Sequence, residues 1–254
     1  MADHISASQI SLFLNEPAAW IVTYLYGVKG SVGAGAWRGS ACEAAMDAIL
    51  FEDASDADAA NVAQTRFEQD AQGDLANDVA KERAAIPLYL TNLLPVARKL
   101  LAEKGKPLVR QARIELNLPE IRPILLGYLD WMWGDQIIDL KTVSRSPSFA
   151  ENGRIKDKPE HLRQMAIYSR AKGKPCTLLY ATPTKQRPAI PYAVSDEECE
   201  IAMRQVLAGA RAMTGLLDAA ARGTLDPVGY PPRDLNDYYW SDETRAVARQ
   251  IWSL

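Results

Sequence analysis

Two apolar segments joined by a short polar turn stand out in the middle of the chain. Ile124 to Trp133 and Gln136 to Thr142 are rich in Ile, Leu and Trp, and only the turn Gly134–Asp135 separates them. Two such segments around a two-residue turn are typical of a tight β-hairpin. The second strand carries Asp139 and Lys141 two positions apart. Because side chains alternate across a strand, these two should point to one face.

The same hairpin places a second acid, Asp130, inside its first apolar strand. Charges in otherwise buried strands are costly unless they are paired or bind a metal. Two acids and a lysine on one hairpin therefore suggest a hydrolytic metal centre. A structural Asp–Lys ion pair on an edge hairpin is the alternative, since buried pairs also occur without a catalytic role.

The hydrophobic pattern on either side of the hairpin predicts several further elements. Helical spacing of apolar residues predicts helices at 6–26 with a break at Pro17, 39–50, 54–103 with an interruption near Ile86–Pro87, 160–172, 195–222 and 242–252. Apolar runs predict strands at 107–118, 176–182 and 189–194. Between the first two helices, Gly27 to Gly39 predicts a flexible connection. Its glycines lack the spacing of a dinucleotide-binding loop, so it is only a weak candidate for a phosphate site.

Composition adds limits on the class of protein. The chain has 254 residues, 48% of them hydrophobic and 24% charged, which is ordinary for a globular protein. Its apolar runs are too short to cross a bilayer, and the start lacks the pattern of a secretory signal. Three cysteines without CxxC spacing disfavour disulfides or a cysteine zinc site. We therefore expect a cytoplasmic protein without membrane partners.

Charge is unevenly distributed along the chain. From Phe51 to Glu82 there are nine acids and two bases, whereas from Lys141 to Lys174 there are nine Lys or Arg and three acids. A basic surface beside the acidic hairpin would suit a polyanionic substrate. Alternatively, both segments are simply solvated helix faces, and we prefer this interpretation for the acidic segment.

The order of elements and several short motifs resemble one nuclease superfamily. A helix, three strands, a helix and a further strand match the restriction-endonuclease-like αβββαβ core of the PD-(D/E)XK nucleases. The motifs resemble the RecB-like branch, which includes phage recombination exonucleases. They are GYLD at Gly127 to Asp130, IIDLKT at Ile137 to Thr142, Gln164-x-x-x-Tyr168, Gly39-x-x-x-Glu43 and a lead-in from Ser6 to Gly27. The resemblance spans residues 5 to 194. It implies a mixed central sheet flanked by helices, in an α/β domain.

The resemblance also implies roles for the motif residues. Asp130, Asp139, Glu43 and the Leu140 carbonyl would hold Mg²⁺ or Mn²⁺, which prefer hard oxygen ligands. Lys141 would orient the attacking water or stabilise developing charge. The helix residues Gln164 and Tyr168 would position the substrate strand or support Lys141. Glu43 lies at the edge of its helix's apolar stripe, so by position alone a solvent-facing rim location is favoured.

Residues outside these motifs complete the expected site. Glu115, on the strand before the hairpin, is a second candidate for metal or its surroundings, or is simply exposed to solvent. The predicted DNA-binding cations follow the second hairpin strand: Arg145, Arg154, Lys156 and Arg163. An iron–sulfur cluster is not expected, because the cysteines that bind it in other members are missing. The chain also lacks a Walker A motif.

These features predict one nuclease domain over residues 1–254, with a helical insertion at about 52–104 and a C-terminal helical segment at about 195–254. The resemblance implies metal-dependent DNA exonuclease activity in phage or prophage recombination, repair or DNA processing, in a bacterial or phage-infected cell. It also implies a single-strand annealing or recombination protein as a potential partner. The alternative is a nuclease-fold subunit that binds nucleic acid or a partner without cleaving. A nucleotide-binding protein using the glycine-rich loop is a more distant alternative.

Overall fold

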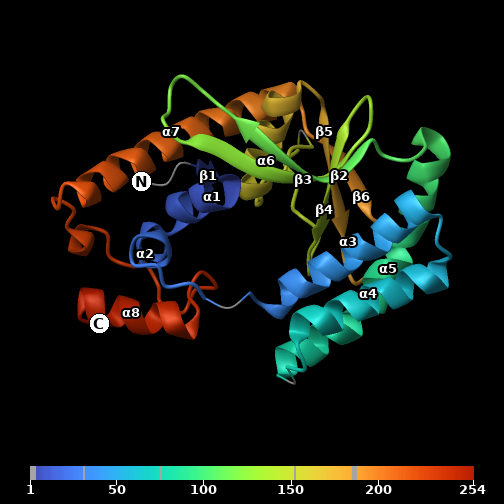
Figure 1. The fold of residues 1–254 in the computed structure, drawn as a ribbon, viewed down its shortest axis with the longest axis horizontal. Helices are drawn as coiled ribbons and strands as arrows, with labels where there is room; N and C mark the ends of the chain where they lie inside the picture. Colours follow the sequence, from blue (N-terminus) through green and yellow to red (C-terminus); the bar gives the residue numbers. More distant parts are fainter. Residues whose placement is uncertain (1–3, 31, 75, 152, 185–187) are drawn as a thin grey trace.

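A mixed β-sheet forms the centre of the molecule (Figure 1). The computed structural model describes residues 4–30, 32–74, 76–151, 153–184 and 188–254. These residues form six strands, β1 (His4–Ser6), β2 (Val109–Leu116), β3 (Ile124–Met132), β4 (Ile137–Thr142), β5 (Cys176–Ala181) and β6 (Ile190–Ala193). The order across the sheet is β1-β3-β4-β5-β6, and β2 pairs with β3. The predicted α/β class with a mixed sheet is confirmed.

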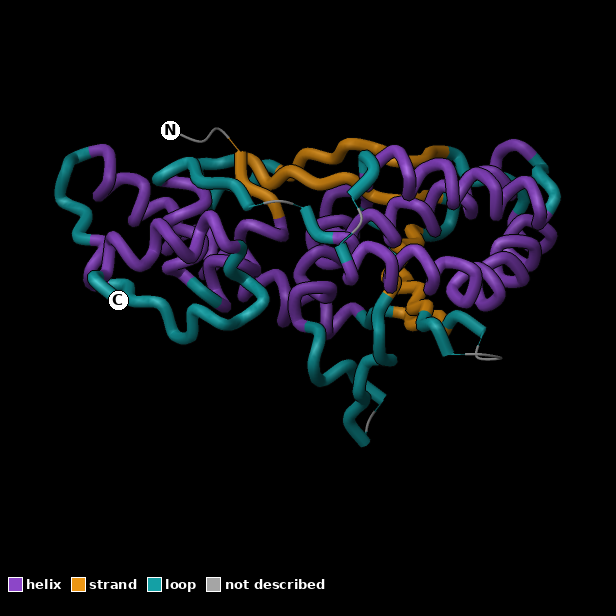
Figure 2. The backbone as a smooth tube through the Cα atoms, turned by 90° about the horizontal axis from the view of Figure 1, so that it is seen from below, coloured by secondary structure: helices purple, strands orange, loops and turns teal. Residues whose placement is uncertain are grey.

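Helices cover both faces of this sheet. The described helices, not all of which touch the sheet, are α1 (Ala7–Asn15), α2 (Pro17–Trp20), the π-helix η1 (Ile21–Leu25), α3 (Ala34–Glu52), α4 (Asp56–Ala71), α5 (Asn77–Lys104), α6 (Pro159–Lys172), α7 (Asp196–Ala221), the 3₁₀ helix η2 (Pro227–Gly229) and α8 (Asp242–Trp252). The last of them, α8, packs on α2 and η1 in a separate hydrophobic cluster. Figure 2 shows helices gathered at both ends of the long axis, with the strands between them. In the described part of the chain, none of the helices has both the length and the apolar character that a membrane span requires.

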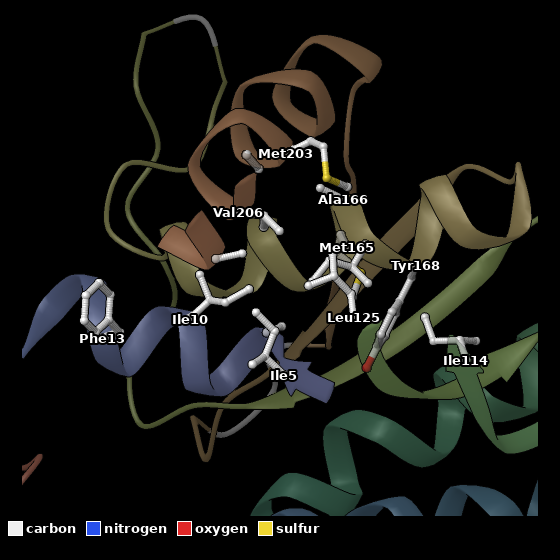
Figure 3. Close-up of a cluster of buried hydrophobic side chains, with 14 of the residues drawn as sticks. Ile5, Ile10, Phe13, Ile114, Leu125, Met165, Ala166, Tyr168, Met203 and Val206 are labelled. Carbon is white, nitrogen blue, oxygen red and sulfur yellow. The ribbon is translucent and has the colours of Figure 1, made fainter. Parts of the chain in front are cut away.

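Alternation along β4 and β5 divides the core into two halves. Ile137 and Leu178 pack in one hydrophobic cluster with residues of α1, α6 and α7 (Figure 3). Ile138 and Leu179, one position further on each strand, pack in a second cluster with α3, α4 and α5. The period of two in these strands thus separates the two helical layers. By this alternation Asp139 shares its face with Ile137, on the side of α6.

The edge of β3 that faces β4 is only partly paired. β2 pairs with β3 from residue 125 to 132, so β1 and β4 must share the other edge of β3. β1 runs parallel to residues 124–126, and β4 pairs antiparallel with residues 131–132. Residues 127–130 lie between these two partners. The sheet therefore forks beside the last of them, Asp130.

The boundaries of some predicted elements were wrong. The predicted interruption near Ile86–Pro87 is absent, because α5 continues through Pro87 and Pro95. Proline removes one helix hydrogen bond, but burial of neighbouring apolar side chains offsets this loss. The chain instead turns at Gln72 and Gly73, both with positive φ. Residue 31, in the predicted glycine-rich connection, and residue 75, in the predicted helical region 54–103, lie outside the described residues.

Two further differences concern the N-terminal part. α3 begins at Ala34, five residues before the predicted start, because Ala34 and Arg38 are buried and extend the packed face of the helix. β1 was not predicted, since three residues are too few to show a periodicity. Ser6, its last residue, caps α1 by accepting a hydrogen bond from the Gln9 N–H at 3.2 Å.

Candidate active site

A buried ion pair on β4 forms the centre of the candidate site. Asp139 is fully buried, and its Oδ2 lies 2.5 Å from the Nζ of Lys141. The two side chains lie on one face of the strand, as alternation requires. Because the pair is largely withdrawn from water, each charge depends on the other.

Asp130 approaches this pair from β3, at the point where the sheet forks. The Leu140 N–H donates a hydrogen bond of 2.7 Å to Asp130 Oδ2. The N–H and C=O of one strand residue point to the same side, so the Leu140 carbonyl also faces Asp130. On the other edge of β3, Gln111 donates a 3.5 Å bond to Asp130 Oδ1. Gln111 has φ of 45°, a left-handed conformation that is uncommon outside glycine.

Glu43 approaches from the opposite layer, on α3. Its Oε1 is buried and has no hydrogen-bond partner among the described residues. Burial, together with the negative charges of Asp47 and Asp139, raises the pKa of Glu43 to about 7. One turn further along α3, Asp47 accepts a 2.7 Å bond from the Trp131 indole. The solvent-facing location considered for Glu43 is therefore not what the structure shows.

The three carboxyl groups influence one another electrostatically. Burial raises the pKa of Asp130 well above its ordinary range, and the charges of Asp139 and Glu43 raise it further. Burial also raises the pKa of Asp139, against the opposing effect of Lys141. For Lys141, burial alone would lower the pKa, but the surrounding carboxylates outweigh it and raise the pKa. A further cation would relieve this accumulation of negative charge.

Two residues of α6 extend the site by hydrogen bonds. The Nε2 amide of Gln164 lies 3.3 Å from Asp139 Oδ1 and 2.6 Å from the Tyr168 hydroxyl. The Tyr168 hydroxyl in turn donates to the backbone carbonyl of Tyr128, which lies between the parts of β3 that pair with β1 and with β4. The spacing of four places Gln164 and Tyr168 on one helix face, and both point toward the hairpin.

The glycine of the GYLD motif allows this approach of α6 to the sheet. A Cβ at Gly127 would lie 2.6 Å from Tyr168 Cε1 and 3.3 Å from Ile114 Cγ1. Figure 3 shows Tyr168 beside Ile114, between α6 and the sheet. Only glycine leaves room for the tyrosine ring at this distance.

Other predicted residues lie outside this group. Glu115 is exposed and forms a 2.6 Å ion pair with Arg113. It lies opposite Leu126, four residues and therefore about 13 Å along β3 from Asp130. The structure thus supports the solvent-facing alternative for Glu115.

The predicted DNA-binding cations differ in their accessibility. The prediction for Arg163 was wrong as to its location: its side chain is 3% exposed and donates to Ser11 Oγ and Gln205 Oε1. It joins α6 to α1 and α7 instead of facing solvent. Arg154 forms an ion pair with Glu197. Arg145 and Lys156 are exposed, in the segment after β4.

The carboxyl groups fit a divalent cation by their chemistry. No three His, Cys, Asp or Glu side chains among the described residues already stand close enough to enclose a metal ion. Mg²⁺ nevertheless needs few protein ligands, because it keeps several waters. The unpartnered Glu43 Oε1 and the mutual repulsion of the three acids are consistent with a cation between them. The donor set is all oxygen, which suits Mg²⁺ or Mn²⁺.

Some residues near the site were missed by sequence reasoning. The Gln111 side chain bonds to Asp130 from a residue whose backbone is left-handed. No local sequence pattern indicated this backbone conformation. His161, on α6, bonds through Nδ1 to the Tyr180 hydroxyl at 2.8 Å. Burial and the positive charge of Lys141 lower the pKa of His161 to about 3, so its ring is neutral. The only available signal for His161 was its position three residues before Gln164.

The forked mixed sheet carries an acid on one hairpin strand and Asp-x-Lys on the next, and a helix glutamine bonds to the latter acid, which is the arrangement that the motif resemblance implied for a nuclease. The family model of the PD-(D/E)XK nuclease superfamily matches residues 4–233. The chain therefore belongs to this superfamily, as the motif resemblance implied.

Comparison with solved structures gives the same fold. A protein from Eubacterium rectale, whose name describes it as a candidate exonuclease, superposes with a TM-score of 0.63 at 13% sequence identity, covering 93% of this chain and 86% of that chain. The structure of SSO0001 matches at 18% identity, covering 57% of this chain and 69% of that chain. Its TM-score of 0.30 is too low to support an argument. No curated protein sequence matches the chain.

Proposed function

We propose that this protein is a Mg²⁺- or Mn²⁺-dependent deoxyribonuclease, acting as an exonuclease of the RecB-like branch. The observation that carries the proposal is the buried Asp139–Lys141 pair, with Asp130 and Glu43 brought to it from a second strand and from α3. A process of phage or prophage recombination, with a single-strand annealing or recombination protein as partner, is part of the same proposal. The motif resemblance and the name of the Eubacterium rectale neighbour support the exonuclease assignment.

The residues present suggest how the reaction is divided among them. Asp130, Asp139, Glu43 and the Leu140 carbonyl would hold the metal, which when bound neutralises phosphate charge and activates water. The Lys141 ammonium, fixed by Asp139, would orient the attacking water and stabilise the charge that develops on the phosphate. Gln164 holds one oxygen of Asp139 and so keeps the carboxylate in one orientation. Tyr168 fixes Gln164 in turn.

The proposal is tested with end-labelled linear DNA and covalently closed circular DNA, incubated with Mg²⁺, Mn²⁺ or EDTA. We expect metal-dependent release of nucleotides from the linear DNA only. Asp139→Asn should lower the rate by at least about two orders of magnitude. Asp135→Asn is the matched control, because this acid lies in the turn of the same hairpin, exposed and paired with Lys104.

Three results would contradict parts of the proposal. Full activity in EDTA, or in Asp139→Asn, would exclude the metal site. Cleavage of the closed circle would show an endonuclease. Binding of DNA without cleavage under all conditions would favour the non-cleaving subunit.

A further inference from the structure

A cleft of about 600 Å³ opens directly beside the candidate active site. Its walls come from the end of β1, α1, η1, β3, α6 and the segment before α8, and most of these lie far apart in the sequence. Gln164 and Tyr168, which connect to Asp139 by hydrogen bonds, line the cleft as well as the site. A strand of substrate bound at the carboxylates would therefore continue into this cleft.

Exposed tyrosine rings are concentrated here. Tyr24, Tyr128 and Tyr238 line the cleft, with 41%, 52% and 79% of their surfaces exposed. Tyr239 also lines it, and its ring centroid lies 4.0 Å from that of Tyr238. A group of exposed aromatic rings around a concave surface indicates a binding site more than a folding requirement.

The polar lining of the cleft is mostly neutral. Ser6, Ser8 and Asn15 contribute hydroxyl and amide groups, and Gln164 contributes a second amide. The titratable lining residues besides the tyrosines are Glu160 and His161. Neither Lys nor Arg is among the described lining residues, so the cleft is poorly suited to phosphate groups. Rings with neutral donors and acceptors match the faces and edges of nucleobases.

We propose that this cleft binds unpaired nucleotides next to the scissile phosphate, with their bases stacked on Tyr24, Tyr128 and Tyr238. Bases in a duplex are already stacked on their neighbours, so these rings would select a single-stranded or frayed end. The inference rests on the proposed nuclease function and adds the form of DNA that the site accepts. The scissile phosphate would lie at the proposed metal, beside the edge of the cleft that Gln164 and Tyr168 share with the carboxylates.

The test measures binding in EDTA, so that the proposed metal-dependent cleavage does not interfere. The probe is a single-stranded decamer of thymidines with one central 2-aminopurine, whose fluorescence falls when the base stacks. Wild-type protein should quench this fluorescence. Tyr238→Ala and Tyr128→Ala should each raise the Kd by about 5- to 150-fold and reduce the quenching at saturation. Tyr238→Phe keeps the ring and should bind within about twofold of wild type.

The matched control is Tyr230→Ala. Tyr230 lies in the same C-terminal segment and is 39% exposed, but it is not among the residues that line the cleft. It should bind the decamer like wild type. A blunt hairpin duplex serves as the second ligand, and Tyr238→Ala should bind it with unchanged affinity.

Normal binding and quenching by both alanine variants would overturn the inference, as would an equal loss of affinity for the duplex. The cleavage assay separates this outcome from failure of the proposed function. If the wild type never cleaves DNA but the alanine variants lose the decamer, the cleft assignment holds and the nuclease proposal fails. If the wild type cleaves DNA and the variants bind the decamer normally, the nuclease proposal holds and the cleft assignment fails.

Discussion

Glu43 is the carboxyl group of the candidate site whose protonation changes near neutral pH. Burial and the acids around it raise its pKa to about 7. Asp47, Asp139 and Lys141 face it, and Arg66 contributes a weaker positive charge. A metal that binds here must displace the protons held by such carboxyl groups, so its affinity depends on pH.

Glu43→Gln is expected to change stability in a pH-dependent direction. In the unfolded chain the pKa of Glu43 is near 4.5, and folding raises it to about 7. Its contribution to stability is thus fully present below about pH 4.5 and is lost as the pH rises through 7. The neutral glutamine avoids this loss, so metal-free Glu43→Gln should be more stable than wild type at about pH 8, by roughly 1–3 kcal/mol, and similar at about pH 5. Thermal unfolding in EDTA at both pH values measures this difference.

The same variant should bind Mg²⁺ more weakly in calorimetry, and its affinity should vary less between about pH 6 and 8 than that of wild type. Asp47→Asn is the neighbouring control on α3, because Asp47 lies one turn from Glu43 and already accepts a hydrogen bond from Trp131. This control should affect Mg²⁺ binding less. An unchanged Mg²⁺ titration in Glu43→Gln would show that this carboxyl group does not reach the metal.

Sequence could predict individual residues of the site where a role follows from local spacing. Asp139 and Lys141 alternate on one strand, and Gln164 and Tyr168 repeat on one helix face, so each pair could be identified without a structure. Arg163 could not be placed in this way, because its burial depends on contacts with α1 and α7.

At the scale of secondary structure, the contact between β3 and α6 joins the strand that carries Asp130 to the helix that carries Gln164. Tyr168 occupies the space above Gly127 and bonds to the Tyr128 carbonyl. The geometry of Gln164, and through it that of Asp139, depends on this contact.

Gly127→Ala is expected to push α6 away from β3. The added methyl would meet the Tyr168 ring at 2.6 Å, so the ring or the helix must move. Overpacking of this kind costs about 1–3 kcal/mol, and we expect a lower catalytic rate as well as a lower free energy of unfolding. Chemical denaturation and the DNA cleavage assay measure the two effects.

Gly134→Ala is the control for this change, since a Cβ there has no neighbour within 4 Å. Equal effects of the two substitutions would show that the Tyr168 contact does not determine the geometry of the site.

The order of helices and strands was predictable because most of them are long and periodic. Their ends were less predictable, since helix α5 tolerates Pro87 and Pro95 through packing that lies elsewhere in the chain. The short strand β1 depends on a partner 120 residues away, at Ile124 to Leu126. Local patterns contain no information about such pairing.

Across the whole molecule, acidic and basic segments are carried by different parts. The helices α4 and α5 contain much of the acidic segment, whereas exposed Arg145 and Lys156 lie in the loop after β4. If DNA passes the carboxylates, its phosphates require cations on the loop after β4 that carries Arg145 and Lys156.

The double variant Arg145→Ala with Lys156→Ala should bind DNA more weakly. If each cation contacts one phosphate, the slope of log K against log salt should fall by up to about two units. The control is Lys81→Ala with Lys99→Ala, which removes the same charge from exposed positions of α5. Fluorescence anisotropy across a salt titration distinguishes them. The same loss in both double variants would indicate a general effect of net charge instead of a DNA path.

The pairing of β1 with β3 also affects how the chain can fold during synthesis. Ser6 cannot pair until Leu126 has been made, and ribosomes add about 5–20 residues per second, so the 120 residues from one to the other take about 6–24 s to appear. During that interval the helices α3, α4 and α5 have only local partners, and the forked edge of the sheet does not yet exist. The nascent chain therefore acquires its candidate active site only after α3, α4 and α5 have been synthesised.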